Sequence, residues 1–258
     1  MFYPRDRVEL AHTVGTLLGK AAVDPRAAVP KAIIAPHAGY IYSGPIAASV
    51  YALLAGARAR IRRVVLMGPT HRVPVQGLAL PAADAFATPL GEVLLDRDAV
   101  AAVTMLPQVI RSGAAHALEH SLEVHLPFLQ TVLDPFTLVP FAVGYASAAQ
   151  VAEVLDAVWG GPETLIVISS DLSHYHPYRD AQSLDRRTAD EILDLRTDIT
   201  HEQACGATPV IGLNLAAQRR GLTPRLLDLR NSGDTAGDRT RVVGYGAFAY
   251  YEGRDDER

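Results

Sequence analysis

Histidine follows a short apolar run at three places in this sequence. His37 comes after AIIAP and His71 after VVLMGPT, while the run LIVISS leads into Asp171 and His174. A single histidine of this kind is as easily explained by a hydrogen-bonded loop residue as by a functional one. Three of them favour a shared site, and neutral imidazoles are ligands that suit Zn, Fe, Cu or Ni.

The single cysteine, Cys205, lies shortly before a predicted helix in the segment ACGATPV. Thr208 followed by Pro209 predicts the start of this helix, with Thr208 as its N-cap. Because a helix N-terminus favours the thiolate, the form that binds metal, we expect a thiol that reacts readily near neutral pH. The alternative is a small buried apolar residue, which is a common role of free cysteine.

The segment HALEHSLEVHLPFLQ concentrates histidine and glutamate. On a helix, His116 would share a face with His120, and Glu119 with Glu123. The spacing differs from the zincin motif, and Pro127 opposes a regular helix unless that helix begins only near Glu123. We predict a solvated loop at His116. The residues predicted to orient metal ligands through hydrogen bonds are His120, Glu123 and His125.

Short apolar strands and helices alternate along the chain. The apolar pattern predicts strands at residues 32–35, 64–67, 137–143, 165–168, 226–229 and 242–251. It predicts helices at residues 8–21, 46–57, 98–106, 148–159, 179–195 and 209–220, and a hairpin-like excursion at 78–95. This alternation is typical of an α/β fold with a mostly parallel central sheet and helices on both faces.

The fold class places the candidate residues together. In open sheets of this kind, ligands bind beyond the carboxyl ends of the strands. We therefore expect His37, His71, Asp171, His174 and Cys205 to converge on one cleft at that edge. The sequence shows no linker, repeat or low-complexity tract, so we predict a single domain over residues 1–258.

Composition narrows the possible partners. A hydrophobic content of 49% over 258 residues is enough for a full core. The formal charge of −4, without a basic stripe, argues against nucleic acid. The apolar runs are shorter than the roughly 18 residues of a membrane span, and the first residues do not resemble a signal peptide. The short apolar runs lead us to expect no membrane partner. Since one cysteine leaves no internal disulfide, we expect a cytoplasmic protein.

Six motifs, in order from about Pro30 to Tyr251, resemble the Memo family, which includes the proteins called AmmeMemoRadiSam system protein B. They are PHAGYIYSGPIAA, GPTH, EHSLEVHLPFLQ, SSDLSHY, ACGATPV and NSGDTAGDRTRVVGYGAFAY. The resemblance implies a fold similar to that of the class III extradiol dioxygenases, non-haem Fe(II) enzymes that open catechol rings.

The resemblance also implies a site. It places the metal ligands at His37, His71 and Cys205, with Asp171 and His174 lining the same cleft. The dioxygenases hold iron with two histidines and a carboxylate, whereas a thiolate shifts the preference towards Cu(I), Zn or thiolate-tolerant iron. Arg72 stands where family members have a second histidine.

These features predict a redox or dioxygenase-type metalloenzyme that acts on a small molecule or a modified residue. Fe(II) or Cu is the favoured metal and Zn is possible, with His174 as acid/base, positioned by Asp171 directly or through water. The family name implies radical SAM and AMMECR-type pathway partners. Two alternatives are a non-catalytic protein that binds a metal, ligand or peptide in a vestigial site, and a zinc hydrolase.

Overall fold

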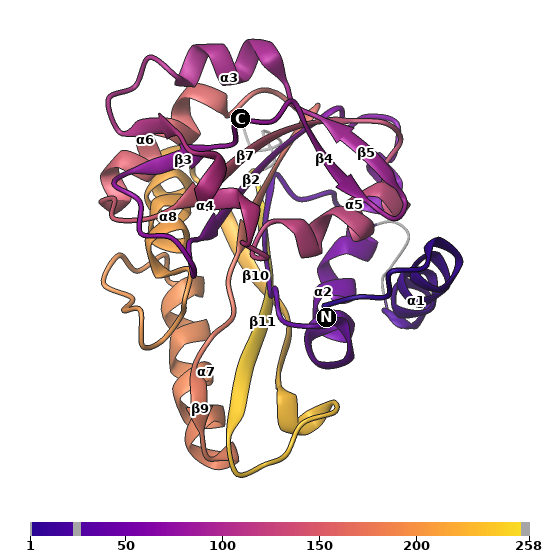
Figure 1. Ribbon diagram of the computed structural model, residues 1–258. Coiled ribbons are helices and arrows are strands. Elements are labelled where there is room, and N and C mark those ends of the chain that lie inside the picture. Colours follow the sequence, from indigo (N-terminus) through magenta and orange to yellow (C-terminus); the bar gives the residue numbers. More distant parts are fainter. Residues whose placement is uncertain (1, 23–26, 254–258) are drawn as a thin grey trace.

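The computed structural model describes residues 2–22 and 27–253. Its main sheet has the strand order β10-β11-β1-β8-β2-β7-β3-β6, with β9 beside β11 (Figure 1). The strands are β1 Ala32–Ala35, β2 Arg63–Pro69, β3 Leu78–Leu80, β4 Ala85–Thr88, β5 Gly91–Leu94, β6 Val109–Arg111, β7 Thr137–Val143, β8 Thr164–Ser169, β9 His174–His176, β10 Thr223–Asn231 and β11 Val242–Tyr251. The four central strands β1, β8, β2 and β7 are parallel, whereas β11 runs antiparallel to β1 and β3 antiparallel to β7.

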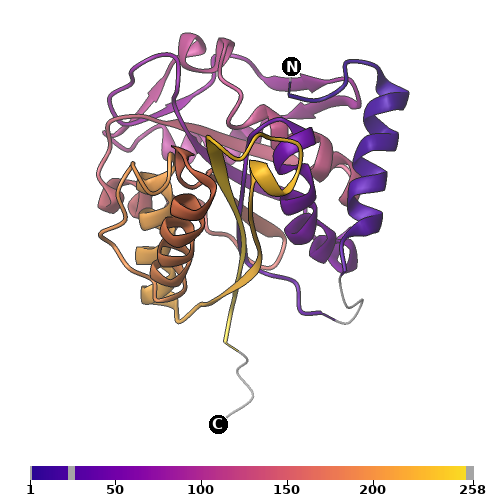
Figure 2. The same cartoon turned by 90° about the horizontal axis from the view of Figure 1, so that it is seen from below.

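Helices cover both faces of this sheet. They are α1 Arg7–Lys20, α2 Tyr40–Tyr51, η1 Ala52–Ala57, α3 Arg97–Val103, α4 Gly113–Ala117, η2 Glu123–His125, α5 Leu126–Val132, α6 Ala148–Val158, α7 Tyr178–Leu193, α8 Ala207–Arg220 and η3 Ser232–Asp234. Figure 2 shows α1 and α2, in indigo and purple, on one side of the sheet and α7 and α8, in orange, on the other. The predicted α/β fold class is confirmed.

Each central strand contributes to two hydrophobic cores. Ile34 and Met67 pack in the core under α6, α7 and α8, whereas Ile33 and Leu66 pack in the core under α1, α2 and α5. Because successive side chains point to opposite faces, a strand covered on both faces is apolar throughout. The cores hold the strand ends, and hence the loops after them, in fixed positions.

Two segments differ from the prediction. The helix expected from residue 46 begins at Tyr40 and continues through Pro45, although proline normally ends a helix. Residues 40–57 are also long and apolar enough to span a membrane, but 61% of this window is buried, as in a core helix. In the expected hairpin at 78–95, β4 and β5 do pair antiparallel, whereas Leu78–Leu80 belongs to the main sheet.

Candidate metal centre

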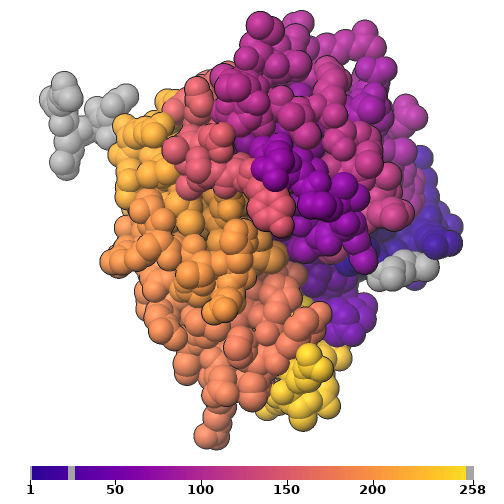
Figure 3. All heavy atoms as spheres, turned by 60° about the vertical axis from the view of Figure 1, so that its left-hand side comes forward, coloured from indigo at the N-terminus to yellow at the C-terminus, as the bar shows by residue number. Residues whose placement is uncertain are grey.

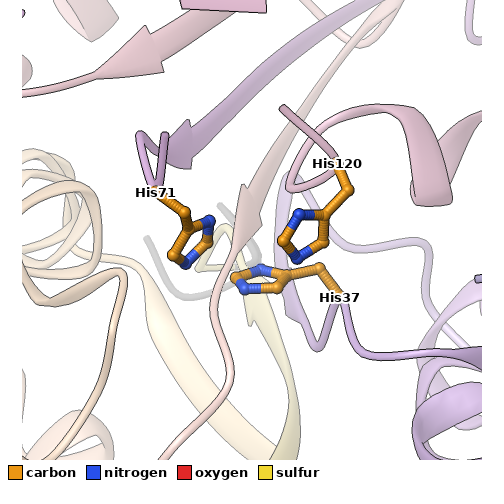
Figure 4. Close-up of side chains that lie close together, drawn as sticks. All are labelled: His37, His71 and His120. Atoms are coloured by element: carbon orange, nitrogen blue, oxygen red, sulfur yellow. The ribbon is translucent and has the colours of Figure 1, made fainter. Parts of the chain in front are cut away.

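Three histidine side chains converge where the central parallel strands end. His37 follows β1, His71 follows β2, and His120 lies in the loop between α4 and η2. One ligand-capable atom of each lies within 4.8 Å of those of the other two, and Figure 4 shows the three rings around a common space. The ring centroids are 5.0 to 5.6 Å apart. This arrangement brings together three imidazole nitrogen donors, the kind of ligand that transition metals prefer.

The hydrogen bonds of His37 fix its tautomer. Its Nδ1 lies 2.7 Å from Ser169 Oγ, and this hydroxyl donates its proton to the backbone carbonyl of Ser121 at 2.5 Å. Since the hydroxyl proton is already used, Ser169 Oγ accepts from Nδ1–H of His37. The lone pair of His37 therefore lies on Nε2, available to a metal ion.

Glu119 orients His71 in the same way. Its Oε1 lies 2.9 Å from Nδ1 of His71, and its Oε2 accepts the backbone N–H of the same residue. The backbone N–H groups of His120 and Ser121 also donate to Oε1, at 2.9 and 3.0 Å. Burial opposes ionisation of Glu119, but the hydrogen bonds from His71 and Ser121 outweigh it and lower its pKa to about 2. An ionised carboxylate only accepts, so His71 also presents Nε2 as its free nitrogen.

Burial favours the neutral imidazoles of His37 and His120. It lowers the pKa of His37 well below the usual value, and the neighbouring His71 adds to the effect. It also lowers the pKa of His120. Nδ1 of His120 is buried and has no hydrogen-bond partner among the described residues. Metal ligands must be deprotonated, so His37 and His120 are in the form that binding requires.

Cys205 lies beside this group. Its Sγ is 3.4 Å from Nε2 of His37, and its backbone N–H donates to the carbonyl of Asp171 at 3.3 Å. The sulfur therefore faces the nitrogen that the tautomer of His37 leaves free. Cys205 thus contacts His37 and shares a cavity with His71, whereas the three side chains whose ligand atoms converge are those of His37, His71 and His120.

The thiol itself is not activated as expected. Burial and the nearby Asp171 carboxylate raise the pKa of Cys205 to about 12, so the prediction of a reactive thiol near neutral pH is wrong for the metal-free protein. The predicted N-cap is also wrong, because α8 begins at Ala207 with Gly206 as N-cap. Partial burial and the neighbouring carboxylate together disfavour the thiolate more strongly than the nearby helix end favours it.

Asp171 and His174 follow β8 on the same edge of the sheet. Oδ1 of Asp171 accepts the backbone N–H of His37 at 2.8 Å, and Oδ2 lies 3.9 Å from Nε2 of His37. Burial raises the pKa of Asp171. The contacts between described residues include no hydrogen bond from Asp171 to His174, which is half-buried on β9. Asp171 thus holds the loop of His37 directly.

The other predicted residues of the 116–130 segment contact different partners. Glu123 accepts a hydrogen bond from the hydroxyl of Tyr3, and Nδ1 of His125 lies 2.8 Å from the hydroxyl of Tyr51. Among the described residues, neither forms a hydrogen bond with a candidate ligand. The solvated loop predicted at His116 is also wrong: this residue lies in α4, half-buried, with Nε2 2.8 Å from the carbonyl of Ala79.

The N-terminal segment covers one side of the group. The ring of Phe2 stacks on His120 with centroids 4.1 Å apart and planes 11° apart. The backbone carbonyl of Phe2 accepts the N–H of Tyr40 at the start of α2. The segment is thereby tied to the scaffold next to a candidate ligand.

One cavity adjoins the group, and a second lies beside His174. One, of about 410 Å³, is lined by His71, Arg72, Tyr145, His201 and Cys205 among others, and a second, of about 710 Å³, by His174, His176 and His201 among others. Figure 3 shows the face where purple, pink and orange chain segments, from distant parts of the sequence, meet. The smaller cavity has the size of a small-molecule site and reaches two candidate ligands.

Sequence reasoning missed two roles in this site. His120 was expected to orient ligands, but its ring is one of the three that converge. Glu119 was recognised only as part of a helical pair, although it holds His71 and the backbone of His120. Its position directly before His120, in a segment that a proline prevents from being one helix, was the available signal.

Comparison with known proteins identifies the family. Residues 1–249 match the model of the family described as Memo-like protein. A MEMO1 family protein of Aquifex aeolicus is 36% identical, over 95% of this chain and 94% of its own, and one of Archaeoglobus fulgidus is 34% identical, over 85% and 86%. The crystal structure of the uncharacterized protein JW3007 from Escherichia coli K12 has a TM-score of 0.51 at 13% identity, over 84% of this chain and 98% of that one, which shows a shared fold. The chain belongs to the Memo family.

Proposed function

We propose that this protein is a metal-dependent enzyme of the redox or dioxygenase type that acts on a small molecule or a modified residue. The observation that carries the proposal is the convergence of His37, His71 and His120, two of them with Nδ1 engaged and Nε2 free. Fe(II) or copper is the favoured metal, and zinc is possible. A metal held there would supply Lewis-acid or redox chemistry.

Cys205 is proposed as a further ligand. Its sulfur lies 3.4 Å from the free nitrogen of His37, so both atoms border the same space. Although the thiol is protonated in the metal-free protein, a coordinating thiol is deprotonated by the metal. Its participation favours soft ions such as Cu(I).

His174 is proposed as the acid/base group. It is half-buried, and it lines the larger cavity, which shares His201 with the smaller cavity at His71 and Cys205. A half-buried imidazole that lines a cavity can exchange protons with a molecule bound there. Asp171 supports this geometry by holding the backbone of His37 at 2.8 Å.

A zinc hydrolase is the second candidate. The observation that favours it is the all-imidazole trio, because catalytic zinc sites commonly use three protein ligands and leave one position open for water. Esterase activity that depends on zinc, without oxygen uptake in the presence of Fe(II) or Cu(I), would support this candidate over the first.

Anaerobic titration with Fe(II), Cu(I) and Zn tests the metal site. We expect one tightly bound ion per chain, and a loss of affinity of more than about 100-fold in His120→Ala, since a ligand contributes more than the roughly 10–100-fold of its supporting contacts. His116→Ala is the matched control, because His116 lies in the same segment and contacts Ala79 instead. Unchanged affinity in His120→Ala would remove His120 from the site.

Oxygen uptake by the Fe(II)- or Cu(I)-loaded protein, with catechol as probe, tests the reaction type. Uptake that disappears in His174→Ala while the metal remains bound would support the proposed role of His174. Tight metal binding without uptake or hydrolysis of any probe would favour the non-catalytic alternative. Shared work with radical SAM and AMMECR-type proteins stays a prediction of the family resemblance.

A further inference from the structure

A buried carboxylate on α7 lies behind the loop that carries Asp171 and His174. Asp185 is 2% exposed, and among the described residues no cation forms an ion pair with it. Its Oδ1 accepts the backbone N–H of Ser173 at 3.0 Å. Burying a carboxylate without a cation costs stability, so this position calls for an explanation other than packing.

A glycine inside β11 fits against the same carboxylate. A Cβ built on Gly244 would lie 2.1 Å from Oδ2 and 2.5 Å from Oδ1 of Asp185. Glycine in a strand interior is itself unfavourable, and often marks a close approach. The backbone of Gly244 also contacts the loop on both sides: its N–H donates to Ser173 and its carbonyl accepts from Leu172, each at 2.8 Å.

These contacts converge on the two residues between Asp171 and His174. The backbone of Gly244 bonds both Leu172 and Ser173, and Asp185 bonds the N–H of Ser173. The next residue, His174, continues directly into β9, which pairs with β11 beyond Gly244. A shift of Ser173 therefore displaces the start of β9 and the imidazole that it carries.

We propose that Asp185 and Gly244 form a clamp that positions His174 and Asp171 relative to the metal ligands. The role of the clamp in positioning His174 for catalysis rests on the proposed function. The clamp itself can be tested in the metal-free protein. A buried carboxylate at position 185 and a glycine inside a strand at position 244 each lower stability. The same contact explains both residues, because the carboxylate reaches Ser173 only when no side chain occupies the space at Gly244.

The clamp predicts coupling between the two positions. In the wild-type background, Gly244→Ala pushes the carboxylate away from Ser173, so it should raise the unfolding equilibrium constant at least about tenfold. In an Asp185→Ala background the clashing atoms are gone. There Gly244→Ala should increase the unfolding equilibrium constant by a factor at least about threefold smaller than in the wild-type background. Equal effects in both backgrounds would overturn the clamp.

Nuclear magnetic resonance of the metal-free protein reads the position of His174. We expect Asp185→Ala to shift the ring resonances of His174 and to speed amide exchange of Ser173 at least about tenfold, whereas Asp185→Asn, which keeps an acceptor oxygen, retains both. Asp190→Ala, on the exposed side of α7, is the matched control and should change neither. A fall in stability with unmoved His174 resonances would reduce Asp185 to a structural residue. Rapid exchange of the Ser173 amide in the wild type would contradict the proposal without any variant.

The visible spectrum of Co(II)-loaded protein connects the clamp to the metal centre. Asp185→Ala should alter the spectrum, because Asp171 lies beside His37, and Asp185→Asn should restore it. If the wild type binds no Co(II), the proposed function fails while the measurements on metal-free protein still decide the clamp. An unchanged spectrum with displaced His174 resonances would contradict the link to the metal.

Discussion

Glu119 accepts hydrogen bonds from the ring and backbone of His71 and from the backbone of His120. It thus orients two of the three candidate ligands with one buried carboxylate. Glu119→Gln replaces an oxygen acceptor by a donor, so at least one of these contacts is lost. We expect metal affinity to fall about 10–100-fold, as for other residues that support metal ligands.

Isothermal titration with Zn measures this effect. Glu123→Gln is the matched control, because Glu123 lies four residues further on and contacts Tyr3 instead of a ligand. Its affinity should stay within about threefold of the wild type. Equal losses in the two variants would mean that Glu119 acts only on the fold of the segment.

Replacement of Cys205 should affect the affinity for soft metals more than the affinity for borderline metals. If its sulfur is a ligand, Cys205→Ser should weaken Cu(I) binding more than about 100-fold and Zn binding less, since the thiolate matters most to the soft ion. Competition titrations with a Cu(I) chelator measure the difference. Bound metal should also alter the alkylation rate of Cys205, which is slow in metal-free protein because burial raises the pKa of the thiol. Equal Cu(I) affinities in the two proteins would remove Cys205 from the site.

At this scale the sequence predicts which residues gather but not how they are oriented. Placement after β1 and β2 was enough to predict that His37 and His71 meet. His120 was assigned to a supporting role together with Glu123 and His125, in a segment for which no strand was predicted. Its ring reaches the group only through the loop between α4 and η2, whose path depends on tertiary contacts such as that between Glu119 and His71.

Elements that lie away from the metal centre should affect stability alone. Ser147 caps α6 in a capping box with Gln150. Ser147→Ala should lower the free energy of unfolding by about 1 kcal/mol and the melting temperature by about 2–4 °C. Ser183→Ala, at an exposed position of α7, is the control with little expected change. Calorimetry measures the shift, and altered Zn affinity in Ser147→Ala would contradict the independence of the two regions.

The bounds of the elements show what apolar patterning can and cannot predict. The strands at 32–35, 137–143 and 242–251 match β1, β7 and β11, because buried strands are continuous apolar runs with clear ends. The start of α8 was misplaced because Thr208 and Pro209 resemble a helix start, whereas Gly206 occupies the cap. Local capping signals compete within a turn, and the packing against Ser170 decides between them.

At the scale of the whole molecule, buried histidines link folding to pH. Burial lowers the pKa of His37 well below 6.5 and that of His125 to about 3. Below pH 6.5 the unfolded chain binds protons that these folded side chains do not, so stability is full above pH 6.5 and is lost as pH falls. From pH 7.5 to 6.0 His125 alone should cost the metal-free protein about 0.8 kcal/mol, and the lowered pKa values of His37, His116 and His120 act in the same direction.

Urea denaturation at several pH values measures this slope, and His125→Gln should reduce the loss between pH 7.5 and 6.0 by about 0.8 kcal/mol. The range stops at pH 6 because Asp185 acts in the opposite direction below it: burial raises the pKa of Asp185 to about 6, so its contribution is present at low pH and is lost as pH rises to that value. A slope that is the same in His125→Gln would show that His125 is protonated in the folded protein.

The contact of Phe2 with His120 bears on how the protein is best purified. An affinity tag of histidines fused ahead of Phe2 would start beside a candidate ligand, since the two rings are 4.1 Å apart, and its imidazoles would compete for the same ions. Tyr250, near the end of β11, pairs with Ala32 at the start of β1, the end of the sheet away from His37. A tag fused after β11 would therefore keep the added imidazoles far from the centre whose stoichiometry is being measured.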